Sequence, residues 1–208
     1  MTSPAARSLV VVRHGRTAHN AKGLLLGRTD APLDELGHRQ ADAAAAALAS
    51  GRFGEVVAVV SSPLLRAVQT AEALGLPVLT DDRLVELDYG IYEGTPVAEL
   101  PAATWATWQS DLDFAPPDGE SLAQLGRRVR EACAEWGTGI GSGGTVVLVS
   151  HVSPVKAAMA WALGVGDGVS WRSHVDNASI TRVQMRGDRP VLSLFNATDH
   201  LCDVTAGG

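Results

Sequence analysis

The stretch of residues 9–20 constrains this chain most, because an apolar run ends there directly in polar residues. Leu9 and three valines lead straight into Arg13, His14 and Gly15. An apolar run of this length that stops at a glycine is typical of a buried strand ending in a loop. In open α/β sheets, ligands bind just beyond the carboxyl ends of the strands. The sequence therefore places Arg13 and His14 in a candidate binding site.

The residues after this run suit a tetrahedral anion. The guanidinium of Arg13 can bind two oxygens, while the imidazole of His14 faces the central atom. Gly15 allows the backbone to turn and approach a bound group closely, and Thr17 and Asn20 add short polar donors. An Arg-His-Gly tripeptide also occurs by chance, so this stretch alone leaves a structural role open.

The same arrangement recurs at two further apolar runs, 56–60 and 145–150. The first predicts a helix with Ser62 as its N-cap and Arg66 one turn in, although Arg66 alone could equally be a solvated surface residue. The second ends at His151 and also leads into a helix. Carboxyl ends of parallel strands share one edge of a sheet, so the residues expected to meet there are Arg13, His14, Arg66 and His151.

The remaining patterns complete an alternation of strands and helices, which is typical of an α/β fold. The strands are expected at 9–12, 56–60, 77–79, 145–150, 178–185 and 191–195, and the main helices at 34–50, 62–71, 121–136 and 152–163. The Gly/Ser-rich connector at 137–144 precedes no second core, so we expect one domain over residues 1–208.

Two segments outside these elements carry candidate functional features. Glu86 lies between apolar residues, and a partly buried carboxyl group is suited to proton transfer. It could equally cap a helix or pair with an arginine. The segment at about 95–120 is rich in proline and aromatic residues and predicts one or two short helices. Both a lid over the site and a packed satellite at the sheet edge remain open for it.

Composition limits the classes of partner. Across 208 residues, 46% are hydrophobic and the formal net charge is −6, so no global basic field exists for nucleic acid or an anionic membrane. Cys133 and Cys202 provide neither a disulfide framework nor a zinc pattern. Residues 1–8 contain one Arg and are followed by an apolar run of only four residues, which is too short for a signal-peptide core or a membrane span. These features predict a soluble, cytoplasmic protein without a bound metal, and the histidines expected to be structural or superficial are His19, His38, His174 and His200.

With these residues in view, the chain resembles the histidine phosphatase superfamily, also called the phosphoglycerate mutase-like family. Residues 13–20 fit its R-H-G-x-T-x-x-N motif, and residues 61–71 fit S-S-x-x-x-R-A-x-x-T-A. Glu86 within 85–94 and His151 at the end of an apolar run complete the set in order. The continuation His151-Val152-Ser153-Pro154 departs from the His-Gly of many relatives and resembles acid phosphatase and α-ribazole phosphatase-like domains.

The resemblance implies a three-layer α/β/α sandwich with a mostly parallel sheet and helices on both faces. It implies that His14 becomes a phosphohistidine, and that Glu86 protonates the leaving group and then activates water. The expected catalytic residues are His14, Glu86, Arg13, Arg66 and His151. The expected phosphate-binding residues are Arg13, Gly15, Thr17, Asn20, Arg66, His151 and Val152, with Thr17 and Gly15 shaping the loop. No metal or other cofactor is expected, and a homodimer is expected only by analogy with relatives.

Three functions stay under consideration. The favoured one is hydrolysis of a small phosphate monoester, with Trp105, Trp108 and Phe114 hinting at an apolar or aromatic leaving group. A cofactor-dependent phosphoglycerate mutase would need a more basic enclosure. The segment between Gly94 and Ser121 has no Lys or Arg, and its acidic residues include Glu99, Asp111, Asp113 and Asp118, a sign expected to disfavour a second anionic group. A non-catalytic phospho-ligand or protein-interaction module is expected to lack a member of the catalytic set.

Overall fold

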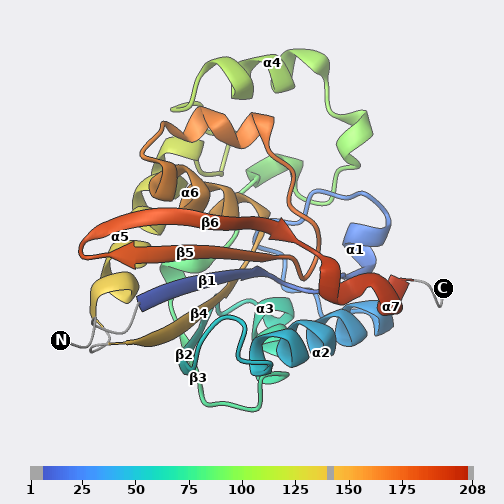
Figure 1. Ribbon diagram of the computed structural model, residues 1–208. Helices are drawn as coiled ribbons and strands as arrows, with labels where there is room; N and C mark the ends of the chain where they lie inside the picture. The colour runs from blue at the N-terminus through green and yellow to red at the C-terminus, as the bar shows by residue number, and fades with distance from the viewer. Residues whose placement is uncertain (1–6, 140–142, 206–208) are drawn as a thin grey trace.

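The computed structural model describes residues 7–139 and 143–205, and its strands form one mixed sheet in the order β3-β2-β4-β1-β5-β6 (Figure 1). The strands are β1 (Arg7–Arg13), β2 (Val56–Ser61), β3 (Val78–Thr80), β4 (Gly144–Ser150), β5 (Ile180–Arg186) and β6 (Arg189–Ala197). The first four run parallel, and β5 is antiparallel to both β1 and β6. All six expected strands are confirmed. The expectations for residues 1–6 and 140–142 lie outside the described residues.

Helices cover both faces of this sheet, which confirms the three-layer α/β/α sandwich (Figure 1). The α-helices are α1 (Ala18–Ala21), α2 (Glu35–Ala49), α3 (Leu65–Glu72), α4 (Ala102–Ser110), α5 (Leu122–Gly139), α6 (Val152–Leu163) and α7 (Cys202–Thr205). Short 3-10 helices are η1 (Asp82–Leu84), η2 (Gly90–Tyr92), η3 (Val97–Glu99), η4 (Asp167–Arg172) and η5 (Asp199–Leu201).

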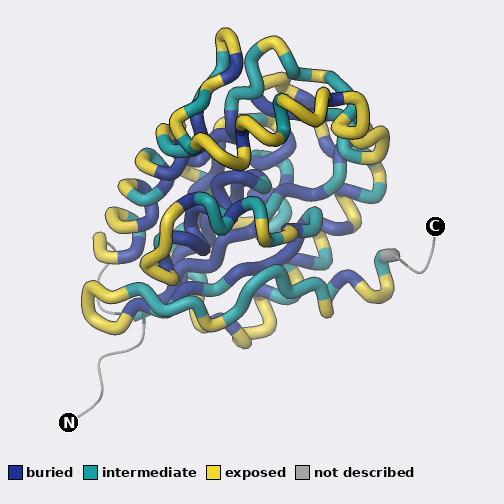
Figure 2. Tube along the Cα trace, turned by 90° about the horizontal axis from the view of Figure 1, so that it is seen from above, coloured by how far each residue is buried: buried dark blue, intermediate teal, exposed yellow. Residues whose placement is uncertain are grey.

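Alternation along β1 divides the core into two layers. Leu9 and Val11 pack with α5 and α6, whereas Val10 and Val12 pack with α2 and α3. Successive side chains of a strand point to opposite faces, so a run that is apolar on every residue must be covered on both sides. Figure 2 shows the result, with buried segments at the centre and exposed ones on the outer loops.

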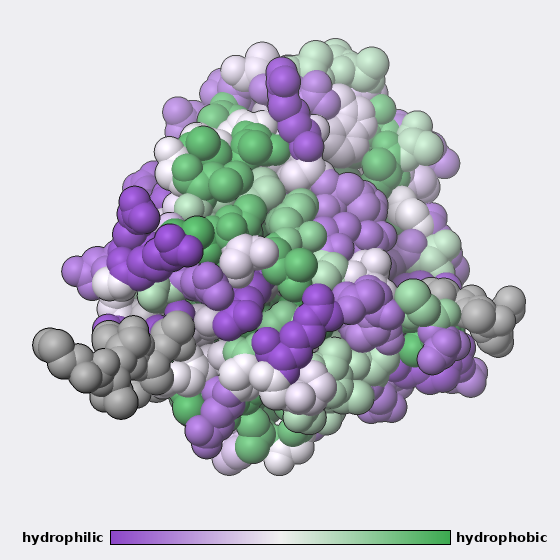
Figure 3. All heavy atoms as spheres, viewed as in Figure 1, coloured by the Kyte–Doolittle hydropathy of each residue, from purple (hydrophilic) through white to green (hydrophobic). Residues whose placement is uncertain are grey.

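Parallel pairing brings three strand ends level with one another. Arg13 pairs with Ser150 across β1 and β4, and Ser61 pairs with Val149 across β2 and β4. The residues just beyond these ends therefore lie side by side at one edge of the sheet, as the sequence predicts. No described helix is long and apolar enough to cross a membrane, and Figure 3 shows polar and apolar side chains interspersed over one face.

One helix start differs from the prediction. Helix α3 begins at Leu65, after Leu64, and has no side-chain cap, so Ser62 is not its N-cap. Instead, the Ser62 hydroxyl lies 2.7 Å from Nε2 of His151. A Ser-Pro pair fits a helix start equally well in sequence, but here tertiary contact with the histidine takes the hydroxyl. Asp34 caps α2 at the start of the predicted helix and accepts a hydrogen bond from Gly37 N at 2.8 Å.

Gly15 has a packing role that the sequence did not indicate. A Cβ at this position would lie 2.3 Å from the carbonyl oxygen of Gly37, in the first turn of α2. Its amide donates to Thr70 Oγ1 at 3.1 Å, so that N–H is not available to a bound anion. The glycine is therefore required for close contact between the β1–α1 loop and a helix backbone, and its expected place in the phosphate site stays a prediction.

The segment at about 95–120 packs as a satellite core above the sheet. Trp108 is buried together with Leu25 and Leu100, and further aromatic residues surround them: Tyr89, Tyr92, Trp105, Phe114 and Trp171. Four of its acidic side chains are exposed and line neither of the cavities described below: Glu99, Asp111, Asp113 and Asp118. Glu120 is partly buried and pairs with Arg128. The position of the four exposed residues gives no support to the expectation that they disfavour a second anionic group on the substrate, and that expectation stays a prediction.

Candidate active site

The residues beyond β1, β2 and β4 converge as expected. His14, Arg66 and His151 are at most 3% exposed, and the two imidazole rings lie with centroids 5.0 Å apart. A cavity of about 160 Å³ opens beside them. Its lining consists of Arg13, His14, Asn20, Leu24, Leu25, Leu26, Glu86, Tyr89, Val97 and Val152. Val97 belongs to the satellite segment, so this segment reaches the rim of the site.

His14 is arranged as a neutral imidazole with one free nitrogen. Its Nδ1 lies 2.7 Å from the carbonyl oxygen of Gly15. A carbonyl can only accept, so Nδ1 carries the proton and Nε2 keeps its lone pair. Burial, followed by the charges of Arg13 and Arg66, holds the pKa of His14 well below its ordinary value. The unprotonated nitrogen is therefore present throughout the neutral pH range.

Two arginines are fixed by backbone carbonyls, and each keeps a buried Nε without a partner among the described residues. Arg66 donates to the carbonyls of Gly27 and Thr29 at 2.7 and 2.8 Å, and Arg13 donates to that of Val175 at 2.7 Å. Burial lowers the pKa of both guanidinium groups and the Glu86 carboxylate opposes this, but arginine stays charged.

His151 lies on the same side of the site as the two arginines, but its ring is neutral. Its Nε2 contacts the Ser62 hydroxyl, while its Nδ1 is buried without a partner in the described part of the chain. Burial, followed by electrostatic interaction with Arg66, His14 and Arg13, holds the pKa of His151 well below its ordinary value. The Nε atoms of Arg13 and Arg66 and Nδ1 of His151 therefore lack partners among the described residues, and a bound group that accepts hydrogen bonds would supply them.

Glu86 is held against the first turn of α6. It is 3% exposed, and its Oε1 accepts hydrogen bonds from the amides of Leu87 and Ser153 at 2.7 and 3.2 Å. Among the described residues, no arginine side chain pairs with Glu86. Of the two structural alternatives, only helix capping matches one of its contacts, the hydrogen bond from the amide of Ser153. Arg128 clamps the preceding backbone by donating to the carbonyls of Arg83, Val85 and Glu86 at 2.7 to 3.1 Å.

The remaining expected residues shape the loop or line the cavity. Thr17 is fully buried and caps α1, and Asn20 Oδ1 accepts from its amide at 3.1 Å. Asn20 lines the cavity, as does Val152, the first residue of α6, whose amide has no partner within the helix. Glu93 accepts hydrogen bonds from the backbone of the 28–29 loop, which supports the carbonyls that hold Arg66.

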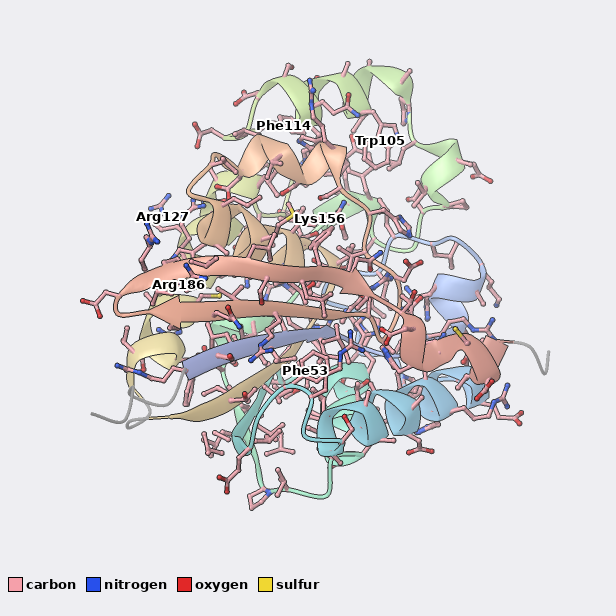
Figure 4. The ribbon with its side chains drawn as sticks, in the orientation of Figure 1. Phe53, Trp105, Phe114, Arg127, Lys156 and Arg186 are labelled. Atoms are coloured by element: carbon pink, nitrogen blue, oxygen red, sulfur yellow. The ribbon has the colours of Figure 1, made fainter. Side chains whose placement is uncertain are left out.

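Sequence reasoning missed four residues of this region. Ser62 was assigned to a helix start, and Tyr89 stood unremarked beside Glu86. Burial raises the pKa of the Tyr89 hydroxyl, and the Glu86 carboxylate adds to this effect. Asn177 Nδ2 donates to the carbonyl of His14 at 3.3 Å, which fixes the loop from β5. Lys156 on α6 lines a second cavity together with Trp105, which comes from α4 above it (Figure 4).

The other histidines and the cysteines lie apart from the cavity lining. His174 is exposed and pairs with Asp176 at 3.0 Å, while His200 contacts the carbonyl of Ala178 at 3.0 Å. Both cysteines are free of disulfides. Among residues 7–139 and 143–205, no group of three or more His, Cys, Asp or Glu side chains could hold a metal ion.

Comparisons with known proteins give the family. The sequence profile of the histidine phosphatase superfamily (branch 1) matches residues 9–198. The bifunctional protein Rv2228c of Mycobacterium tuberculosis is 40% identical over 201 residues, which cover 93% of this chain. The chain spans only 54% of that relative's length. Phosphoserine phosphatase 1 of Hydrogenobacter thermophilus is 33% identical over 208 residues, covering 93% of each chain.

A solved structure agrees with the sequence relatives. Mycobacterial glucosyl-3-phosphoglycerate phosphatase Rv2419c, in a complex with VO3, superimposes with a TM-score of 0.83 at 34% identity. The match covers 93% of this chain and 100% of that one. The profile spans most of the chain, and the strand ends carry the motifs in the expected order. This chain belongs to branch 1 of the histidine phosphatase superfamily.

Proposed function

We propose that this protein is a metal-independent phosphomonoesterase that acts through a covalent phosphohistidine on His14. One observation carries the proposal: a neutral His14 with a free Nε2 adjoins three buried nitrogens that lack partners, on Arg13, Arg66 and His151. A phosphoryl group supplies the acceptors that these nitrogens need. Phosphoryl transfer depends chiefly on positioning and on compensation of charge at the equatorial oxygens.

In the first step, Nε2 of His14 attacks phosphorus and the bond to the ester oxygen breaks. Glu86 donates its proton to the departing oxygen, so the alcohol leaves neutral. The phosphorylated ring keeps the proton on Nδ1, and the carbonyl of Gly15 at 2.7 Å stabilises the positive charge that develops there. The guanidinium groups of Arg13 and Arg66 compensate the phosphoryl oxygens.

In the second step, water takes the phosphoryl group from His14. The Glu86 carboxylate accepts a proton from this water, the new P–O bond forms and the N–P bond breaks. Inorganic phosphate, neutral His14 and protonated Glu86 result, which restores the starting state. Dividing hydrolysis into two displacements replaces one difficult step with two easier ones.

His151 acts as a neutral donor in both steps. If the hydroxyl of Ser62 donates to Nε2 of His151, the ring proton resides on Nδ1 and points to the anion as a donor. The opposite tautomer would present a lone pair to a phosphoryl oxygen and repel it. The Ser62 oxygen also accepts from Leu64 N at 3.3 Å, which favours its hydroxyl acting as the donor toward His151.

The substrate that we propose is a small phosphate monoester of the cytoplasm. Relatives named for phosphoserine and for glucosyl-3-phosphoglycerate support a phosphatase rather than a binding module. The complete catalytic set argues in the same direction, because a module that only binds needs no nucleophile beside a carboxyl group. We propose no macromolecular partner besides the small substrate, and the homodimer stays a prediction.

The test is hydrolysis of p-nitrophenyl phosphate with EDTA present, comparing wild type with His14→Ala and with His38→Ala. His38 is exposed on α2 and serves as the matched control. We expect turnover in EDTA, its loss in His14→Ala, and stoichiometric ³²P labelling only of forms that retain His14. Full activity in His14→Ala would refute the nucleophile, and loss of activity on chelation would refute metal independence.

The phosphoglycerate mutase alternative needs its own assay, because the position of the exposed acidic residues of the satellite segment gives no support to the argument against it. Interconversion of 3-phosphoglycerate with trace 2,3-bisphosphoglycerate present is the decisive measurement. A phosphatase releases inorganic phosphate and gives no isomer. Rapid isomer formation with little phosphate release would replace the proposed hydrolase by a transferase.

A further inference from the structure

A second cavity of about 140 Å³ adjoins the catalytic one, and the two share Tyr89 and Val152 in their walls. One side is built from indole rings of the satellite segment and η4, and the other from polar side chains of α6 and η4. Its lining consists of Leu87, Tyr89, Trp105, Trp108, Leu122, Val152, Ser153, Lys156, Ser170 and Trp171. A group attached to a phosphoryl at His14 can therefore extend into this space.

Lys156 is the charged residue in this lining, and no Asp or Glu accompanies it there. Its side chain is half-buried and makes no hydrogen bond or ion pair with residues 7–139 or 143–205. Figure 4 shows it between the sheet and α4, on the same side as Trp105. A partly buried ammonium that makes no ion pair carries a desolvation cost, and an anionic group bound beside it would offset that cost.

Three further polar atoms of the cavity walls are unsatisfied, whereas the hydroxyls of Tyr89 and Ser153 contact each other at 3.5 Å. Nε1 of Trp108, Nε1 of Trp171 and Oγ of Ser170 are buried without hydrogen-bond partners among the described residues. Trp108 is 1% exposed and Ser170 is 4% exposed. Indole N–H groups and ammonium groups can only donate. The cavity therefore requires a ligand that brings acceptor oxygens together with a carbon skeleton for the aromatic faces.

We propose that this cavity binds the alcohol portion of the substrate, and that this portion carries a carboxylate held by Lys156. The proposal rests on the proposed phosphatase function, and it identifies the class of leaving group. A single positive charge matches a monoanionic carboxylate. A dianionic second phosphate would leave one negative charge uncompensated among the aromatic walls, because Lys156 is the charged residue in the lining. The four exposed acidic residues of the satellite segment line neither cavity.

The experiment compares phenyl phosphate with its 3-carboxy and 4-carboxy derivatives, which differ only in the carboxylate and its direction. The measured quantity is the ratio of kcat/KM for a carboxylated substrate to that for phenyl phosphate. Effects on the shared phosphoryl chemistry divide out of this ratio. We expect wild type to prefer at least one carboxylated isomer by about tenfold, the magnitude of a hydrogen bond to a charged group in a partly open site.

Three variants locate the source of the preference. Lys156→Met keeps the length of the side chain and removes the charge, and the ratio should fall to about 1. Lys156→Arg keeps the charge and should retain a preference, which shows that the altered position still folds. Lys22→Met is the matched control, because Lys22 is exposed beside α1 and outside both cavities, and its ratio should equal that of wild type.

The outcomes separate this inference from the function on which it rests. Hydrolysis of phenyl phosphate without any preference for a carboxylated isomer would overturn the inference and leave the phosphatase intact. So would a Lys156→Met enzyme in which all three substrates slow equally. Failure of wild type to hydrolyse any of the three would overturn the proposed phosphatase, and the leaving-group site with it.

Discussion

Replacing Ser62 with alanine removes the hydroxyl that holds Nε2 of His151, and this substitution separates positioning from folding. The contact is 2.7 Å long and both residues are fully buried. Without it, the ring keeps a buried nitrogen unpaired, and its proton is free to occupy either nitrogen. The net value of such a hydrogen bond is about 0.5–1.5 kcal/mol. If that energy is used to orient His151 toward the phosphoryl group, kcat/KM should fall by about 2- to 12-fold.

The adjacent serine provides a matched control. Ser61 is equally buried and donates to the carbonyl of Ser62 at 2.7 Å, but it does not contact the histidine. Ser61→Ala and Ser62→Ala should therefore lower the free energy of unfolding by comparable amounts, about 1–3 kcal/mol each. Only Ser62→Ala should weaken the reaction beyond what stability explains.

The assay is kcat/KM for p-nitrophenyl phosphate together with the inhibition constant of vanadate, at a temperature where both variants remain folded in urea-free buffer. Vanadate presents the oxygens that His151 is expected to contact, so its inhibition constant should rise for Ser62→Ala and stay constant for Ser61→Ala. Equal losses of activity in the two variants would refute the positioning role. The same conclusion would follow if vanadate inhibited both variants as strongly as wild type.

Three further perturbations test other parts of the site. Glu86→Gln should lower kcat/KM for phenyl phosphate by about 100-fold or more and that for p-nitrophenyl phosphate much less, because nitrophenolate leaves without a proton; equal losses would contradict the acid role. Because burial lowers the pKa of both site histidines, the unfolded chain binds more protons below pH 6.5. The free energy of unfolding should then fall by about 1 kcal/mol per histidine between pH 6.5 and 5.5. In urea titrations, His14→Gln should remove the contribution of one histidine to this fall. An unchanged pH dependence of the unfolding free energy in that variant would disprove the assignment. Gly15→Ala should destabilise by about 1–3 kcal/mol through collision with Gly37, measured by urea unfolding. Gly166→Ala, where an added Cβ has no neighbour within 4 Å among the described residues, should not, and equal effects would contradict the collision.

The strands and their convergence could be predicted because local pattern and tertiary role agree there. An apolar run such as 145–150 has few options other than a strand buried on both faces, and the level of its end follows from parallel pairing. Ser62 shows where this agreement fails. Its sequence context fits a helix cap as well as a contact to His151, and only the approach of another strand end decides between them. The packing contact of Gly15 could not be predicted for the same reason, because its partner Gly37 is 22 positions away in the chain.

The electrostatics of the site follow from burial rather than from composition. The formal net charge of the chain is −6, yet the charged residues that line the two cavities are two cations, Arg13 and Lys156, and one carboxyl group, Glu86. Acidic residues counted along the satellite segment lie in solvent, where water and salt screen their charges. Lys156 stands among apolar residues of α6 and lines the cavity instead, half-buried, so water and salt screen its charge less. One half-buried ammonium therefore outweighs four exposed carboxylates in selecting a ligand, which is why the experiment on Lys156 is a better test of substrate class than any tally of charges.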